Sequence, residues 1–321
     1  MREQSPDGGH ELVTEFVRDE PDSLTPPDAA TLMFAAVESD AGRSQKKGLG
    51  IGGWLCVFWL AVLTVVAIAG FVTGQNIPGL PDPKNDVGDF KVPPLSPGHP
   101  LGTNSSGEDM LSLIANGTSA SMAIGVFSVA IGFAFGGLFG VLSGYFKGRI
   151  GTVLGSTTDI LLAFPPLVLA ISIVTFLGNS LWWVTVALAI VSIPVLARIA
   201  RASTLTWAER EFVTAARAQG AKHGRIMVRE LVPNVLPAMF SIALLGIAVV
   251  IVAEAGLAIV GAGVDVETVT WGAIINAGRQ DITDAPWIVL EPSFVIFLTV
   301  MSLNYLGDVL RAKFDVRESA L

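Results

Sequence analysis

The residues that could take part in chemistry gather in one polar segment, residues 210–237, which lies between two long apolar runs. Ala215 and Ala216 favour a helix, Gly220 interrupts it, and a second, basic helical turn follows over residues 222–229. Side chains of these kinds make packing and ionic contacts and do not catalyse a reaction. The segment therefore indicates contact with a partner or, more simply, an ordinary cytoplasmic loop of a membrane protein.

Outside this segment, the residue types needed for catalysis or metal binding are scattered. The three histidines (His10, His99 and His223) are far apart, and the single cysteine, Cys56, lies in an apolar run. They make no metal-ligand spacing and no internal disulfide. The chain has no clustered nucleophile or acid pair and no G-x-x-x-x-G-K-[ST] loop. We therefore expect no enzyme activity, no bound cofactor and no binding of ATP by this chain itself.

The composition is that of a protein whose main solvent is lipid. Hydrophobic residues make up 51% of the 321 residues and charged residues only 15%, with a mean hydropathy of +0.61. The charges cluster outside long apolar runs, as expected when much of a chain lies in a bilayer. The net charge of -8 and the few basic residues argue against a nucleic-acid partner.

Six apolar stretches are long enough to cross a membrane, so we expect an all-α polytopic membrane protein. A spanning helix needs about 20 apolar residues. The charge-free stretch 160–197 has roughly twice that length, and a break at residues 177–180 divides it into two antiparallel helices. The expected spans are residues 49–74, 120–145, the two halves of 160–197, 235–261 and 287–306.

Glycine recurs in the second of these spans. Small residues let helix backbones approach closely in lipid, so we expect this helix to pack against other helices rather than face lipid all round. The glycines concerned are Gly125, Gly132, Gly136, Gly137, Gly140 and Gly144.

The distribution of Lys and Arg predicts the orientation of the spans. Seventeen of the twenty lie in the N-terminal tail, at residues 147–149, within residues 198–229 or at the C-terminus. Cytoplasmic loops carry an excess of Lys and Arg, so both ends of the chain and the segment 210–237 are expected in the cytoplasm.

The chain divides into three parts. Residues 1–47 hold ten acids and five bases, cannot bury enough apolar surface to fold, and are expected to be a disordered cytoplasmic tail. Residues 48–117 hold the first span and an external segment rich in Pro and Gly. Residues 118–317 hold the other five spans and a cytoplasmic loop at about 204–234.

The loop resembles the EAA loop of ABC-importer permeases. That pattern is Glu-Ala-Ala, three residues, Gly, nine residues and then Ile-x-Leu-Pro, and Ala215, Ala216, Gly220 and Pro233 stand at matching positions. The departures are Thr214 for Glu, Glu230 for Ile and Val232 for Leu. We expect Pro233 and Pro237 to close the basic turn before the chain becomes apolar again.

Further motifs resemble one subfamily, the C-type permease subunit of dipeptide and oligopeptide ABC importers. HPLGTNSSGEDMLS (residues 99–112) looks like the pattern HPLGTD-x-x-GRD-x-LSR, and the resemblance covers roughly residues 50–316. Matching motifs that follow in order are DILLAFPPLVLAISIV (159–174), EAGLAIVGAGV (254–264), WGAIINAGR (271–279) and FLTVMSLNYLGDVLR (297–311). The departures are Asn104 for Asp, Glu108 for Arg and Glu291 for an apolar residue.

This resemblance implies a type I importer permease fold and a chain that forms half of a channel. The implied partners are a second related permease, two ABC ATPase subunits (or one fused ATPase) and an extracytoplasmic peptide-binding protein. ATP and Mg would bind to the ATPase subunits. The implied cargo is a di- or oligopeptide, carried across the cytoplasmic membrane by alternating access.

In this family the loop couples the membrane helices to the ATPase. The candidates for that contact are Glu211, Thr214, Ala215, Ala216, Gly220, Lys222, Arg225 and Pro233. We expect Ala215 and Ala216 to form a flat helix face that fits a groove on the ATPase, and Gly220 to set the turn to the next helix. Glu211 would supply part of the charge that Thr214 lacks. The alternative is that the alanines only favour helix.

A second set of candidates would line the path or form its gate: Asp159, Phe164, Pro165, Glu254 and Asp308. We expect Asp159 to open the third span, as a cap or a gate contact, and the prolines at 165–166 to kink that span. Glu254 is expected near the outer end of the fifth span, with Arg279 as a conceivable partner. The plain alternatives are a dipole-stabilising acid at a helix start and simple packing.

Other functions stay open at this point. Permeases of the same subfamily carry nickel and other small solutes. A stand-alone secondary transporter would show mid-span charges and an inverted repeat, and neither is evident. A membrane scaffold without a path would not depend on an ATPase partner.

Overall fold

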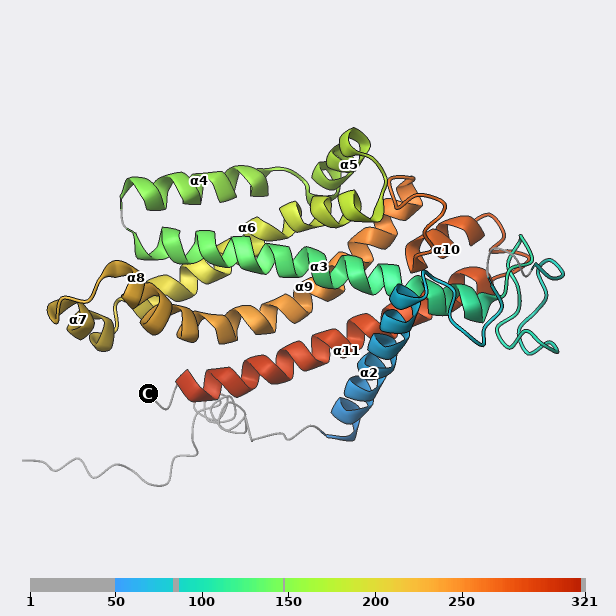
Figure 1. Cartoon of the computed structure of the whole chain (residues 1–321), viewed down its shortest axis with the longest axis horizontal. Coiled ribbons are helices and arrows are strands. Elements are labelled where there is room, and N and C mark those ends of the chain that lie inside the picture. The colour runs from blue at the N-terminus through green and yellow to red at the C-terminus, as the bar shows by residue number, and fades with distance from the viewer. Residues whose placement is uncertain (1–49, 83–86, 147, 319–321) are drawn as a thin grey trace, which may run out of the picture. The chain divides into compact units, whose positions relative to one another are not determined.

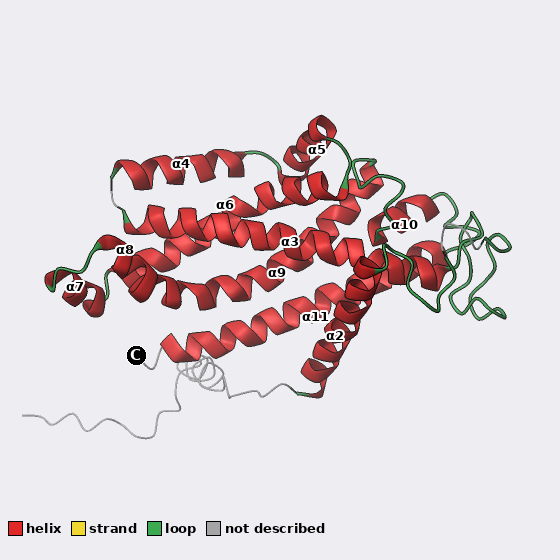
Figure 2. Ribbon diagram, viewed as in Figure 1, coloured by secondary structure: helices red, strands yellow, loops and turns green. Residues whose placement is uncertain are grey.

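The computed structural model describes residues 50–82, 87–146 and 148–318 (Figure 1). Within these ranges no strand forms, and the expected all-α class is confirmed (Figure 2). The acidic segment 1–47 lies outside the described residues, so its disorder stays a prediction. The long helices are α2 (Ile51–Val72), α3 (Met110–Tyr145), α6 (Leu181–Ala208), α9 (Val232–Val260) and α11 (Trp287–Glu318). The shorter ones are α4 (Arg149–Ala163), α5 (Pro166–Leu177), α7 (Glu211–Ala218), α8 (His223–Ile226), the π-helix η1 (Met227–Leu231) and α10 (Trp271–Gly278).

Five helices of the described ranges are long and apolar enough to cross a membrane, and α4 with α5 makes a sixth candidate. This third span begins at Arg149, well before the expected start near residue 160. It also bends by 90° between α4 and α5. The bend has a chemical cause, because Pro165 and Pro166 lack the amide hydrogens that would continue the helix.

The second span is longer than expected, since α3 starts at Met110 and runs for 36 residues. Asp109 fixes this start because its carboxylate accepts a hydrogen bond from the Ser112 amide at 2.9 Å. A helix of this length is about 54 Å long, so its outer turns extend beyond the hydrocarbon layer.

The glycines of α3 form contact surfaces with two neighbouring helices, as predicted. Every fourth residue from Gly132 to Gly144 faces α6, and an added Cβ at Gly136 would lie 2.6 Å from the Ile193 carbonyl oxygen. On another face, a Cβ at Gly125 would meet Ile251 of α9. Because these glycines have no side chain, α6 and α9 lie close to the backbone of α3.

The segment between α2 and α3, which was expected to be external, is tied to the end of the bundle that carries α10. The Gln75 amide nitrogen donates to the Val269 carbonyl at 2.8 Å, and its amide oxygen accepts from the Val269 amide at 3.0 Å. The Trp287 indole donates to the Thr103 carbonyl at 3.1 Å. These bonds hold the segment against the start of α11 and the loop before α10.

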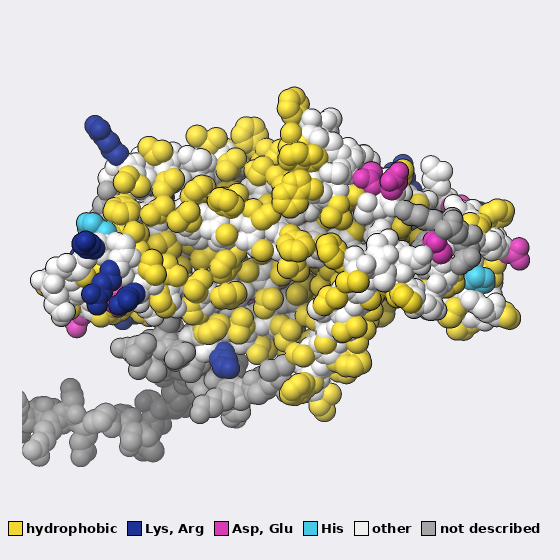
Figure 3. Space-filling model, in the orientation of Figure 1, with side chains coloured by type: hydrophobic (Ala, Val, Ile, Leu, Met, Phe, Trp, Pro, Cys, Tyr) yellow, Lys and Arg dark blue, Asp and Glu magenta, His cyan; other side chains and the backbone are white. Residues whose placement is uncertain are grey.

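Figure 3 shows how charged side chains are distributed over the described residues. Lys and Arg side chains gather at the end that carries α7 and α8, acidic side chains gather toward the opposite end, and hydrophobic side chains cover the surface between them. An apolar band between two charged ends is the surface expected of a chain that crosses a bilayer.

Candidate functional site

The helix α7 presents a face of small side chains away from the protein. Val213 is fully buried and Ala216 half-buried, whereas Glu211, Thr214 and Ala215 are exposed. Residues three and four apart share one face of a helix, so the exposed three form one surface together with Ala218. Glu211 and Thr214 therefore lie on the same surface, where a carboxylate is available beside the position at which the EAA pattern has Glu.

A hydrophobic cluster fixes α7 to three membrane helices at the same end of the bundle. The cluster draws on α3, α6 and α9 as well as on the loop itself. Its members are Val141, Tyr145, Ala200, Trp207, Val213, Ile226, Leu231, Val235 and Met239. A displacement of α7 therefore acts on α3, α6 and α9 together, because close-packed side chains transmit strain.

Two cation–π contacts add to this attachment. The Arg210 guanidinium lies 5.4 Å from the centre of the Trp207 ring, and the Arg217 guanidinium lies 5.3 Å from the centre of the Tyr145 ring. The Trp207 ring is also 6.2 Å from that of Phe212. One aromatic residue on α6 and one on α3 thus hold both ends of α7.

Gly220 ends α7 in the left-handed conformation, with φ of +79°. The Gly220 amide donates to the Arg217 carbonyl at 3.0 Å, and the Ala221 amide donates to the Ala216 carbonyl at 3.0 Å. A Cβ at Gly220 would have no atom within 4 Å, so the requirement for glycine there comes from the backbone alone. This is the turn that the sequence predicted at this position.

The expectation that Pro233 and Pro237 close the basic turn is wrong. Helical structure continues from His223 to Val260, with Pro233 in the first turn of α9 and Pro237 inside it. The π-helix η1 directly precedes these prolines, and its wider turn accommodates a ring that cannot donate a hydrogen bond. Lys222 and Arg225, which precede and begin this stretch, are both exposed.

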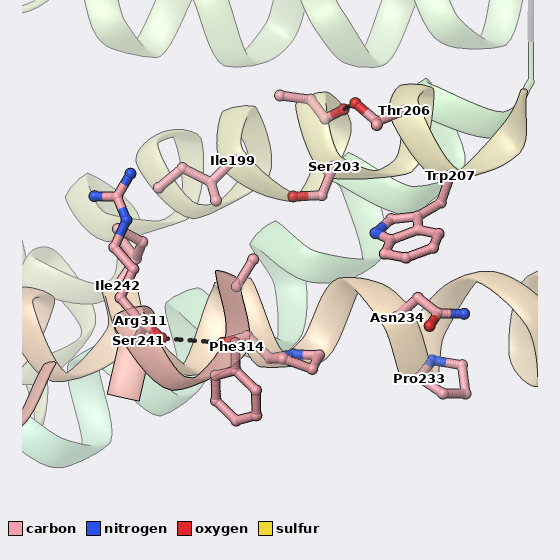
Figure 4. A pocket seen from close by; sticks show the side chains of 13 residues that line it. Ile199, Ser203, Thr206, Trp207, Pro233, Asn234, Ser241, Ile242, Arg311 and Phe314 are labelled. Carbon is pink, nitrogen blue, oxygen red and sulfur yellow. Dashed lines mark hydrogen bonds between the residues drawn. The ribbon is translucent and has the colours of Figure 1, made fainter. Parts of the chain in front are cut away.

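A cavity of about 650 Å³ lies between α6, α9 and α11 near the same end of the protein (Figure 4). Its lining mixes apolar groups with hydroxyl, amide and guanidinium groups. Labelled lining residues include Ser203, Thr206, Trp207, Asn234, Ser241 and Arg311. Trp207 belongs both to this lining and to the cluster under α7, so the cavity and the loop share one side chain.

Trp207 and Tyr145 were missed as functional candidates in the sequence. Each stands at the end of a long helix, and each has an arginine of α7 or its cap over its ring. An aromatic residue at the end of an apolar span, followed within three residues by Lys or Arg, was the available signal.

Asp159 does not open the third span, in contrast to the expectation. It lies inside α4, ten residues after Arg149, because the helix starts earlier than predicted. Its carboxylate pairs with Arg198 of α6 at 3.1 Å. Phe164 and Pro165 follow at the bend between α4 and α5, so these three candidates lie within two turns of each other.

Glu254 is 1% exposed near the outer end of α9, and its partner is not Arg279. One carboxylate oxygen accepts a hydrogen bond from the Thr270 hydroxyl at 2.8 Å, and the other makes none within the described ranges. The Arg279 guanidinium donates to the Ile259 carbonyl instead, at 3.2 Å. Asp308 is exposed on α11, so the five path candidates do not form one cluster.

Comparisons with known proteins show the family of the chain. Residues 136–319 match the family described as binding-protein-dependent transport system inner membrane component. The chain is 38% identical over 217 residues to the dipeptide transport system permease protein DppC of Alkalihalophilus pseudofirmus, which covers 68% of this chain and 71% of that protein. It is 37% identical over 220 residues to the glutathione transport system permease protein GsiD of Pectobacterium atrosepticum, over 68% of this chain and 73% of that protein. It is also 37% identical over 240 residues to the di/tripeptide transport system permease protein DppC of Pseudomonas aeruginosa, over 73% of this chain and 79% of that protein.

Among solved structures, the fold is similar to a chain of the MetNI methionine ABC transporter in an inward-facing conformation. The TM-score is 0.54 at 22% identity, over 63% of this chain and 97% of that chain. This likeness concerns the fold alone.

Proposed function

Because the chain belongs to the family of inner membrane components of binding-protein-dependent transport systems, we propose that it carries di- or oligopeptides across the cytoplasmic membrane as the permease subunit of an ATP-driven importer. The family and the importer permease fold expected from the motifs are confirmed. The chain is a transport subunit and not an enzyme.

The outward surface of α7 is the observation that carries the coupling part of this proposal. It is exposed, it consists of small side chains around Glu211, and it is attached to the inner ends of α3, α6 and α9. A surface of this kind receives a protein partner and passes its movement to the membrane helices. The partner is an ABC ATPase pair, or one fused ATPase, which binds ATP and Mg.

The other partners follow from the architecture. One set of six spans forms one wall of a path, so a second related permease completes it. The tied external segment and the acidic outer end face an extracytoplasmic binding protein that delivers the cargo. The excess of Lys and Arg around α7 and at both ends of the chain favours cytoplasmic termini.

Peptide cargo is supported by the relatives, which are named for dipeptides, di/tripeptides and glutathione. All of these are short and carry both an ammonium and a carboxylate. Cargo identity is tested by uptake of labelled di- and tripeptides into vesicles that contain the assembled transporter.

The coupling surface is tested by an Ala215→Trp change on α7 in the tagged, full-length protein. Overpacking of a fitted contact costs about 1–3 kcal/mol, or roughly 5- to 150-fold in binding. We expect loss of ATPase co-purification in mild detergent and loss of peptide uptake.

The matched control is Ala61→Trp, at an exposed alanine of α2. It should retain both the bound ATPase and uptake, because α2 lies outside the α7 cluster. An Ala215→Trp variant that keeps both would refute the assignment of α7.

A further inference from the structure

The third span contains an interruption whose backbone is not fully hydrogen-bonded by the helix. At the bend, the Phe164 amide donates to the Leu161 carbonyl at 3.4 Å. In a continuing helix the next carbonyl, that of Leu162, would accept a hydrogen bond from residue 165 or 166, but both are prolines without an amide hydrogen. This carbonyl needs a partner from outside the helix.

The interruption lies on the surface of the chain. Phe164 is 52% exposed, Leu167 47% and Val168 56%. Irregular backbone at membrane depth is tolerated where it is buried in protein or lines a water-filled cavity, because an unpaired group in hydrocarbon costs several kcal/mol. This face of the chain therefore does not face lipid.

An ion pair on the same side of α4 leads to the same conclusion independently. The side chains of Asp159 and Arg198 are 62% and 65% exposed while they pair at 3.1 Å. Charged side chains in membrane spans face a bundle interior or a water-filled cavity. Asp159 precedes the bend by about one turn, so the charges and the open carbonyl share one surface.

The depth of this surface follows from helix lengths. Arg198 is the eighteenth residue of α6, about 25 Å from its outer end. The bend is four residues beyond Asp159 along α4, or about 6 Å farther out. It therefore lies beside the charge-free part of α6, residues 181–197, within the bilayer.

We propose that residues 159–168 and Arg198 form the wall of a water-filled path. The proposal rests on the proposed function and names where the cargo passes. Water partners both an open carbonyl and an exposed ion pair, whereas a dry contact with the second permease would have to bury them. The wall presents one charge of each sign, and so it suits a hydrated zwitterion, such as a peptide with free ends.

The test is thiol labelling, which is simple here because the chain has a single cysteine. Cys56→Ser gives a cysteine-free chain, into which Phe164→Cys or Leu167→Cys is introduced. Val65→Cys, 68% exposed within α2 but remote from any charge or bend, is the lipid-facing control. The assembled transporter in membrane vesicles is treated with a water-soluble, charged thiosulfonate reagent, without nucleotide and with trapped ATP.

Only a thiol that reaches water forms the reactive thiolate. We expect Phe164→Cys and Leu167→Cys to react at least about tenfold faster than Val65→Cys in one of the two states. Rates equal to the control in both states would overturn the proposal in favour of a dry face. Co-purification of the ATPase and peptide uptake, measured on the same samples, report separately on the proposed function.

Discussion

The hydroxyl of Tyr145, the last residue of α3, lies 2.8 Å from Nδ1 of His223, the first residue of α8. The same phenol ring carries the Arg217 guanidinium of α7 over its face. One side chain thus joins a membrane helix to both α7 and α8.

The change Tyr145→Phe removes this hydrogen bond and keeps the ring. A single hydrogen bond contributes about 0.5–1.5 kcal/mol, so a small loss of thermal stability is expected, together with faster hydrogen exchange in residues 211–226. Tyr145→Leu, which also removes the ring under Arg217, should loosen the loop further. If exchange in the loop is equal in wild type and both variants, Tyr145 does not hold the loop.

The glycine contact between α3 and α6 gives a second prediction. A Cβ at Gly140 would lie 2.5 Å from the Ala197 carbonyl oxygen and would also collide with Ala200. Gly140→Ala should therefore destabilise the protein by about 1–3 kcal/mol, since two backbones must separate. The measurement is the unfolding midpoint in detergent.

Gly246→Ala is the control for this change. A Cβ there would lie 3.5 Å from the nearest atom, a Val129 methyl, which is an ordinary contact. Equal midpoints for the two variants would show that the glycine contact in solution is looser than the structure has it.

The sequence predicted the apolar spans, the break at residues 177–180 and the glycine surface of α3 because each depends on local composition. The partners of single charges were not predictable in this way. Asp159 pairs with a residue 39 positions away, and Glu254 pairs with a threonine that caps α10 rather than with a cation. Periodicity reports which face is apolar and does not report which side chain lies opposite.

The kink predicted at residues 165–166 is confirmed, whereas the expectation for Pro233 and Pro237 was wrong. Pro165 and Pro166 produce a 90° bend, whereas Pro233 and Pro237 leave a continuous helix. Pro165 and Pro166 are adjacent, so the ring of Pro166 disfavours the α conformation at Pro165, whose ψ is 125°, whereas Pro233 and Pro237 are four residues apart. In addition, a π-helix precedes Pro233, and such a feature depends on tertiary packing.

The pair Lys91 and Asp281 gives the external segment a defined dependence on pH. Their charged atoms are 2.6 Å apart, and the Ser105 hydroxyl also donates to Asp281. The hydrogen bond from Lys91 lowers the pKa of Asp281 from its ordinary value of 3.8, and the same bond raises the pKa of Lys91 from 10.5. The Asp281 contribution is present above pH 3.8 and is lost as the pH falls through the lowered pKa. The Lys91 contribution is present below pH 10.5 and is lost as the pH rises through the raised pKa.

We therefore expect the amides of residues 99–109 to lose protection in acid, after correction for intrinsic exchange rates. Lys91→Met should make this acid-induced loss of protection, the acid step, smaller, because the pKa of Asp281 then lies closer to its ordinary value. Lys91→Arg, which keeps the charge, should preserve it. The effect should also shrink in high salt, as for other partly exposed pairs. An acid step of the same size in Lys91→Met would rule out this pair as its cause.

Asn104 and Glu108 depart together from the Asp and Arg of the family pattern, and the structure gives the reason. The Asn104 amide oxygen accepts hydrogen bonds from the Ser106 and Glu108 amides, each at 2.9 Å, and its nitrogen donates to the Glu108 carboxylate at 2.5 Å. Asn104→Asp would keep the two backbone bonds, remove the donor and place two carboxylates together. We expect this change to destabilise the external segment. Glu108→Arg should destabilise it as well, because the neutral Asn104 side chain cannot form an ion pair with an arginine.

The double variant Asn104→Asp/Glu108→Arg restores opposite charges at the same positions. It should be more stable than the sum of the single changes predicts, with a coupling of about 0.5–3 kcal/mol in a double-mutant cycle. Unfolding midpoints of the four proteins supply the cycle. Strict additivity would mean that the two departures are independent, and that the 2.5 Å contact does not hold the segment in solution.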